Sequence, residues 1–280
     1  MMQTPDIGGM VLEHTADSRV VELPFDIEWH LPSNWYLWGI NVSPTKHVVF
    51  MAFAAVMVLV TLIVAARSIE RRHRLGKAPA GFGGAIEALV LFLRDEIAIA
   101  NIGPAGAKFA PYIAALFFFI LYCNLLGLFP WGTTPTGNVA VTGTLAITAF
   151  LAIEVSGMVA LGPAGYIRTI VMVPKGMKGI GAVMMALIMT PVELIGKFVK
   201  PFALCLRLFA NMTSGHFVIL SLLGLIFLFG TTAYVRWFVA GFATGFVLFM
   251  MALELFVAFL QAYIFALLTS VFIGLMQHEH

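Results

Sequence analysis

The longest apolar run of the sequence, residues 181–229, constrains the fold more than any other feature. It holds four charged residues: Glu193, Lys197, Lys200 and Arg207. A helix rises about 1.5 Å per residue, so this run would extend roughly 70 Å, more than twice the ~30 Å hydrocarbon core of a bilayer. The run is therefore either two membrane spans or one long, strongly tilted helix.

The charges in this run favour one helix. Two spans would turn near the segment KFVKPF and leave Lys197 and Lys200 outside, against the charge pattern of the other loops. We therefore expect a single helix, bent at Pro191 or Pro201. The composition also indicates a membrane protein, because 61% of the residues are hydrophobic and only 11% are charged, against roughly 25% in soluble domains.

Further apolar runs predict an all-α integral membrane protein. We expect five membrane-crossing helices plus a cytoplasmic interfacial helix, the last two crossings being long and strongly tilted as a hairpin. A polar extracytoplasmic tail over 1–47 precedes a membrane domain over 48–280. The expected helices are 48–66, 85–100 (interfacial), 109–130, 139–161, 181–229 and 236–276.

The distribution of charge predicts the orientation. A basic segment follows the first crossing, whereas the tail before it is acidic, which places the N-terminus outside and the C-terminus in the cytoplasm. The loop after residue 161 is also basic and is expected inside. The basic residues are Arg67, Arg71, Arg72, Arg74 and Lys77, then Arg168, Lys175 and Lys178; the acids of the tail are Asp6, Glu13, Asp17, Glu22, Asp26 and Glu28.

Several classes of partner and site are excluded on composition. The net charge of +2, without a basic cluster interleaved with aromatics, argues against nucleic acid. Cys123 and Cys205 lie in separate apolar segments, so they form neither a disulfide framework nor a CxxC metal or redox site. His14 and His30 are irregularly spaced, as on a solvated surface. We predict no cofactor and no metal.

Polar side chains gather on one face of the 181–229 helix. At about 100° per residue, they fall within an arc of roughly 100°, whereas His216 points to a different side. On the last helix, Glu254 and Gln261 are seven residues apart and share a face. The residues of the polar face are Glu193, Lys197, Lys200, Arg207, Asn211 and Ser214.

Arg207 raises the main question of function, because a charge at mid-membrane costs at least about 2.5–3.5 kcal/mol. One explanation is an ion pair within the chain. Glu193 lies 14 residues away, roughly 21 Å along the same helix, and is too far, which leaves Glu254. The other explanation is that Arg207 faces a carboxylate on a separate, moving polypeptide, attracting it and keeping it unprotonated.

These residues resemble a known family. The motif LRLFANM, the preceding Lys200–Pro201, the acid Glu193 and the later pair of Glu254 and Gln261 resemble subunit a of the F-type ATP synthase. NLLGLFP and PTGNVAVT resemble the second hairpin of that family. The resemblance covers the chain from about residue 35 onward.

The resemblance implies a non-catalytic stator subunit with two offset proton half-channels against a rotating ring. Arg207 matches the essential arginine that separates the half-channels. Asn211, His216, Glu254 and Gln261 match positions lining the outer half-channel, and Glu193 matches an acid of the cytoplasmic one. The implied partners are the c-subunit ring, the b-subunit peripheral stalk, the remainder of the complex and lipid, in the bacterial plasma (inner) membrane.

The sequence departs from some members of the family at two places. His216 and Glu254 exchange the positions of the acid and the histidine, which keeps one pair able to relay protons. Gly127 and Asn138 stand where some relatives carry aspartates, which leaves the outer vestibule less acidic. The ionisable pair favours H⁺ over Na⁺ as the coupling ion without deciding it.

Two other classes of membrane protein fit the same residues less well. An intramembrane protease would need an activated nucleophile, and the sequence has no GxSxG elbow. A secondary transporter would be expected to show paired repeats, which the sequence also lacks. We keep an ion-coupled secondary transporter as the alternative. Lys197 and Lys200 are expected to be interfacial, snorkelling residues, and Glu154 to be solvated, with an open role.

Overall fold

The computed structural model describes most of the chain, which divides into two compact units. The described residues are 18–23, 27–32, 36–37, 40–41, 43–78, 80–129, 132–170, 180–229 and 235–278. The first unit comprises Met1–Thr61, Phe118–Val141 and Leu208–Ala262. The second comprises Leu62–Phe117, Thr142–Arg207 and Tyr263–His280.

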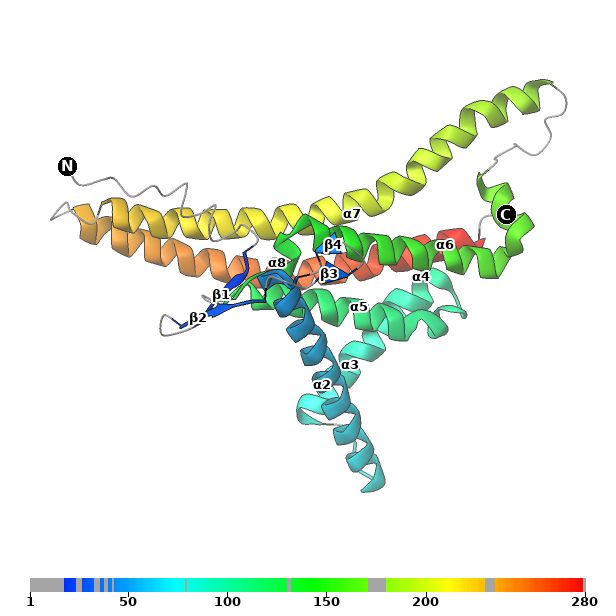
Figure 1. Cartoon of the computed structure of the whole chain (residues 1–280). Coiled ribbons are helices and arrows are strands. Elements are labelled where there is room, and N and C mark those ends of the chain that lie inside the picture. Colours follow the sequence, from blue (N-terminus) through cyan, green and yellow to red (C-terminus); the bar gives the residue numbers. More distant parts are fainter. Residues whose placement is uncertain are drawn as a thin grey trace. The chain divides into compact units, whose positions relative to one another are not determined.

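Five described helices are long and apolar enough to cross a membrane, so the predicted all-α class with five crossings is confirmed. The 181–229 run forms one helix, and the alternative of two spans with a turn is wrong. Pro191 and Pro201 both lie inside it. The five helices (Figure 1) are α2 (Lys46–Arg74), α5 (Gly106–Leu126), α6 (Val139–Ile170), α7 (Ile180–Leu228) and α8 (Val235–His278).

Two short antiparallel pairs of strands lie within the range 1–47, and the sequence analysis did not predict them. β1 (Val20–Leu23) pairs with β2 (Ile27–His30), and β3 (Tyr36–Leu37) pairs with β4 (Ile40–Asn41). The backbone amide of Lys46 donates to the carbonyl of Ser18 over 3.0 Å, which ties the first pair to the start of α2.

The first unit is held by a small apolar core between α2 and α5. Ala54 packs with Cys123 and Leu126 in this core. The hydroxyls of Thr61 and Tyr122 lie 2.7 Å apart and form a hydrogen bond between the same two helices. Within this unit α7 and α8 lie side by side (Figure 1). They approach so closely that a Cβ at Gly215 of α7 would lie 2.7 Å from Glu254 Oε1 of α8.

The second unit packs a short helical segment against the end of α8. The segment comprises α3 (Gly81–Phe92), a π-helical turn η1 (Leu93–Ile99) and α4 (Ala100–Ile102), where the sequence predicts the interfacial helix 85–100. Leu93, Ile97 and Ala98 are buried, and Ser270 of α8 donates to the carbonyl of Ile97 over 2.8 Å. Its place relative to a membrane stays a prediction.

α6 breaks at Gly162, directly after residue 161, where the sequence predicts the end of the helix 139–161, but helical residues continue beyond the break. Gly162 has φ 69°, in the left-handed region that glycine adopts readily, and Pro163 follows it. The helix therefore changes direction there and continues to Ile170. Tyr166 lies beyond this change of direction.

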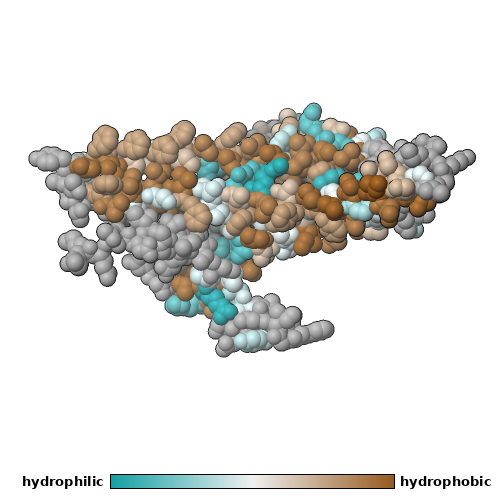
Figure 2. Space-filling view, turned by 90° about the horizontal axis from the view of Figure 1, so that it is seen from above, coloured by the Kyte–Doolittle hydropathy of each residue, from teal (hydrophilic) through white to brown (hydrophobic). Residues whose placement is uncertain are grey.

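The exposed surface of the long helices is strongly apolar. Figure 2 shows hydrophobic residues over much of the visible face, with hydrophilic residues in patches between them. Such a surface suits lipid or protein neighbours better than water. Its most exposed large members on α7 and α8 include Val183, Leu187, Phe202, Trp237, Phe238 and Phe256.

Candidate functional site

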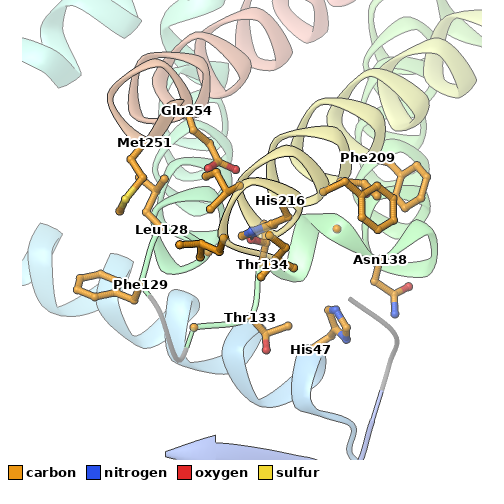
Figure 3. Close-up of a pocket in the computed structure, with 18 of the residues that line it drawn as sticks. His47, Leu128, Phe129, Thr133, Thr134, Asn138, Phe209, His216, Met251 and Glu254 are labelled. Atoms are coloured by element: carbon orange, nitrogen blue, oxygen red, sulfur yellow. The ribbon is translucent and has the colours of Figure 1, made fainter. Parts of the chain in front are cut away.

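A large pocket lies in the first unit, with a volume of about 730 Å³. It is bounded by the start of α2, by residues of 127–129 and 132–139, and by α7 and α8. Figure 3 shows that the side chains of His216 and Glu254 point into it from α7 and α8. Two of the predicted site residues therefore share one cavity.

His216 is half-buried and has a defined partner. Its Nε2 atom forms a hydrogen bond with the hydroxyl of Thr134, which lies beside it in Figure 3. Gly127 makes this arrangement possible, because a Cβ there would overlap Thr134 Oγ1 and would lie 3.0 Å from His216 Nε2. The glycine noted in the sequence as a missing acid therefore has a steric role.

Glu254 is 4% exposed, and within the described residues neither of its carboxylate oxygens has a hydrogen-bond partner. Its close neighbour is Gly215, where a Cβ would lie 2.7 Å from Oε1. A side chain at that position would displace the carboxylate. The sequence does not reveal this role of Gly215, because only the fold brings the two helices so close.

His216 and Glu254 are therefore neighbours in a cavity but are not bonded to each other. A proton that passes between them needs an intervening hydrogen-bonding molecule. The cavity has room for water, since about 10–15 Å³ of such volume holds one molecule. His47 and Asn138 line the same cavity, so its wall includes further polar groups.

Asn211 and Gln261 lie in the same unit, but neither lines this pocket. Asn211 is half-buried, and its carbonyl accepts a hydrogen bond from Ser214 Oγ over 3.1 Å. Gln261 is buried. The structure thus brings together two of the four residues predicted for the outer half-channel.

A buried hydrogen-bond network holds the chain around Thr136, next to the pocket, in place. The Thr136 hydroxyl donates to Asn124 Oδ1 over 2.7 Å, and Asn124 Nδ2 donates to the carbonyl of Ala258 over 3.2 Å. These bonds join the short helix η2 (Pro135–Gly137) to α5 and α8. The sequence signal for this network was the polar Asn124 inside an apolar run.

Arg207 is exposed on α7. Among the residues that the structure describes, it has no ion pair and no side-chain hydrogen bond. The predicted alternative of an ion pair within the chain is therefore not seen among these residues. Along α7, the chain passes from the second unit to the first directly after Arg207.

Glu193 lies in the second unit and lines a much smaller cavity together with Glu154, Lys197 and Lys200. Two expectations for these neighbours are wrong. Glu154 is buried instead of solvated, and Lys197 is buried instead of snorkelling. The two form an ion pair, with Lys197 Nζ 3.6 Å from Glu154 Oε2. Lys200 is exposed, with its Nζ atom over the ring of Phe272.

Known proteins are similar to this chain over most of its length. Residues 48–274 match the family described as ATP synthase A chain. The chain is 43% identical to ATP synthase subunit a of Chloroherpeton thalassium over 96% of this chain and 77% of that protein. It is 41% identical to ATP synthase subunit a of Anaeromyxobacter dehalogenans, over 96% and 70% of the two chains.

A further relative is ATP synthase subunit a of Myxococcus xanthus, which is 45% identical over 86% of this chain and 76% of that protein. The family match, over residues 48–274, covers nearly all of the membrane-crossing helices and includes both His216 and Glu254. On this similarity and on its five apolar helices, the chain belongs to the ATP synthase subunit a family.

Proposed function

We propose that this chain is the stator subunit a of a rotary F-type ATP synthase and provides two offset proton half-channels to a c-subunit ring. The family establishes the general role: the chain is a multi-pass membrane subunit of an ATP synthase, acting in ATP synthesis and proton transport without being the catalytic subunit. The half-channels and the role of each residue are our proposal.

The observation that carries the proposal is the exposure of Arg207. A guanidinium within an apolar helix is costly unless something compensates its charge, and no described acid of this chain pairs with it. A carboxylate on a neighbouring polypeptide would supply that compensation. We propose that this carboxylate belongs to the c-ring and is exchanged as the ring turns.

The pocket of the first unit supports an outer route. We propose that protons enter through it, pass His216 and Glu254, and neutralise a ring carboxylate, with Asn211 and Gln261 completing the lining. A histidine and an unpaired carboxylate that share a cavity are suited to accept and release protons in turn.

The inner route is proposed to run past Glu193 to the cytoplasm. After nearly a full rotation, the ring site returns and releases its proton there, while Arg207 attracts the next deprotonated carboxylate. Rotation then drives ATP synthesis elsewhere in the complex. We place the chain in a bacterial plasma (inner) membrane with its N-terminus outside, in contact with the c-ring, a b-subunit peripheral stalk and lipid.

Purification of the tagged chain in mild detergent, followed by reconstitution into liposomes, tests the proposal. We expect it to co-purify with a ring of small two-helix subunits and a soluble ATPase, and the reconstituted complex to pump protons when ATP is added. A secondary transporter would instead move its ion as a single polypeptide, and that result would overturn the proposal.

The coupling ion is tested separately, by ATP synthesis after a pH jump in sodium-free medium. Since His216 and Glu254 line one pocket and are both proposed to exchange protons, we expect synthesis to proceed without sodium. A strict requirement for sodium would contradict a proton route.

A further inference from the structure

A second polar cluster lies in the second unit, and the proposed mechanism does not use it. Glu154 of α6 and Lys197 of α7 are each 7% exposed, and Lys197 Nζ lies 3.6 Å from Glu154 Oε2. The hydroxyl of Tyr166, beyond the break in α6, donates a hydrogen bond to the same oxygen. Lys197 Nζ also lies 4.6 Å from the centre of the Tyr166 ring.

A small cavity of about 20 Å³ lies beside this cluster. Its polar lining is Glu154, Glu193, Lys197 and Lys200, and the remaining lining is apolar. The volume suits one water molecule, which needs about 10–15 Å³ and two or more polar partners. The cavity is therefore of the size of one water molecule and is lined by two acidic and two basic residues.

Lys197 supplies the reason to expect a water molecule there. Its Nζ atom is buried and has no hydrogen-bond partner among the described residues, because 3.6 Å to Glu154 exceeds the usual hydrogen-bond length of about 2.9 Å. A water molecule in the cavity could accept a hydrogen bond from Lys197. It could then donate one to a carboxylate.

Stability alone gives little reason for such a cluster. Replacing a buried ion pair by apolar residues of similar volume is often neutral or stabilising, because the pair must be removed from water. Ionisable side chains within membrane segments more often mark ion or proton routes. The cluster shares its cavity with Glu193, the acid already proposed for the inner route.

We propose that Glu154 is a second proton-carrying carboxylate of the inner half-channel, next to Glu193, with Lys197 and Tyr166 as positioning residues. This inference rests on the proposed function. The protonated carboxyl of Glu193 donates its proton to the cavity water, which donates one of its own to the carboxylate of Glu154. Each O–H bond broken is matched by one formed, and Lys197 is the counter-charge of Glu154 after the proton leaves.

The test separates a proton route from a structural ion pair. Three variants of the complete ATP synthase are compared in inverted vesicles: Glu154→Gln, Glu154→Asp and the double variant Glu154→Leu/Lys197→Leu. The readout is ATP-driven proton pumping per assembled complex, with assembly measured by the amount of membrane-bound ATPase. The double variant fills the site with apolar side chains and removes both members of the ion pair, so a merely structural role predicts wild-type pumping.

If Glu154 carries protons, Glu154→Gln and the double variant lose at least about tenfold in pumping while assembled, and Glu154→Asp stays within about threefold of wild type. Wild-type pumping by the double variant would overturn the inference. Should the double variant not assemble, the test rests on Glu154→Gln and Glu154→Asp. Proton pumping at the wild-type rate by both variants would then overturn the inference.

The same vesicles distinguish this inference from the proposed function. Wild-type vesicles that pump protons and Arg207→Ala vesicles that do not would support the proposed function whatever Glu154 does. If these two behave as expected while the double variant pumps normally, only the role of Glu154 is lost. If Arg207→Ala pumps normally, the proposed function itself is contradicted.

Discussion

At the scale of single residues, the large pocket of the first unit contains a carboxylate that lacks a partner among the described residues. Glu254 is buried, and its oxygens accept no hydrogen bond from the described residues. A buried polar group without a partner is costly, and the cavity beside it has room for water. A carboxylate held in this way is free to take up a proton and to release it again.

The first prediction concerns His216→Ala and Glu254→Gln. Each change removes a group that can exchange protons in the pocket, so we expect proton uptake to slow at least about tenfold, measured as ATP synthesis after a pH jump. Met251→Leu is the control, because Met251 lines the same pocket and the volume is conserved. Unchanged synthesis in both variants would remove the pair from the route.

The second prediction concerns the close approach of α7 and α8 at Gly215. In Gly215→Ala, the added Cβ would lie 2.7 Å from Glu254 Oε1 and would displace the carboxylate, so we expect ATP synthesis to fall several-fold. Gly245→Ala on α8 is the matched control, since a Cβ there meets nothing within 4 Å in the described structure. Equal rates for the two variants would show that the position of the carboxylate is unimportant.

The sequence could predict the ionisable residues of the site but not the residues that give them room. Arg207, His216 and Glu254 are conspicuous in apolar runs, because a charge or an imidazole there needs an explanation. Gly127 and Gly215 matter only because other side chains approach them in the fold. No local pattern in the sequence contains that information.

At the scale of elements, the contact between the 81–102 segment and α8 is close enough to be sensitive to one methyl group. A Cβ at Gly274 would overlap the carbonyl oxygen of Asn101, and Ser270 bonds the carbonyl of Ile97 one turn earlier on α8. Backbone atoms cannot move aside as a flexible side chain can. The segment and α8 are therefore fixed against each other at this point.

The third prediction follows from that contact. Gly274→Ala should force the segment away from α8 and lower the thermal stability of the assembled complex, seen as a loss of proton pumping at a lower temperature than for wild type. In Gly241→Ala, at an open position on the same helix, the temperature at which pumping is lost should stay unchanged or rise slightly, because alanine has a higher helix propensity than glycine. Identical melting of both variants would contradict the close packing.

Hydropathy predicted which helices exist but not where each one ends. α2 continues to Arg74, past the predicted residue 66, because the basic residues are good helix formers and the chain leaves the helix only near Gly76, where φ is 65°. The strands and the π-helical turn carry weak local signals, whereas the break at Gly162 coincides with a Gly–Pro pair and with the predicted end of the helix at residue 161. The single long α7 was predictable, because two of its charges argue against a turn.

At the scale of the whole molecule, each of the two units has a cavity lined by ionisable groups. The first unit has the pocket of His216 and Glu254, and the second has the cavity of Glu154 and Glu193. One cavity per unit is what two separate half-channels require. The chain crosses from one unit to the other on α7 directly after Arg207, the residue proposed to separate the half-channels.

The most direct test of the proposed mechanism is ATP-driven proton pumping by Arg207→Ala in inverted vesicles. Arg71→Ala, which removes another exposed arginine, is the control and should pump as wild type does. Because Arg207 is proposed to hold the deprotonated carboxylate of the ring, we expect Arg207→Ala complexes to assemble but to show no measurable pumping. Pumping at the wild-type rate by assembled Arg207→Ala complexes would contradict the mechanism.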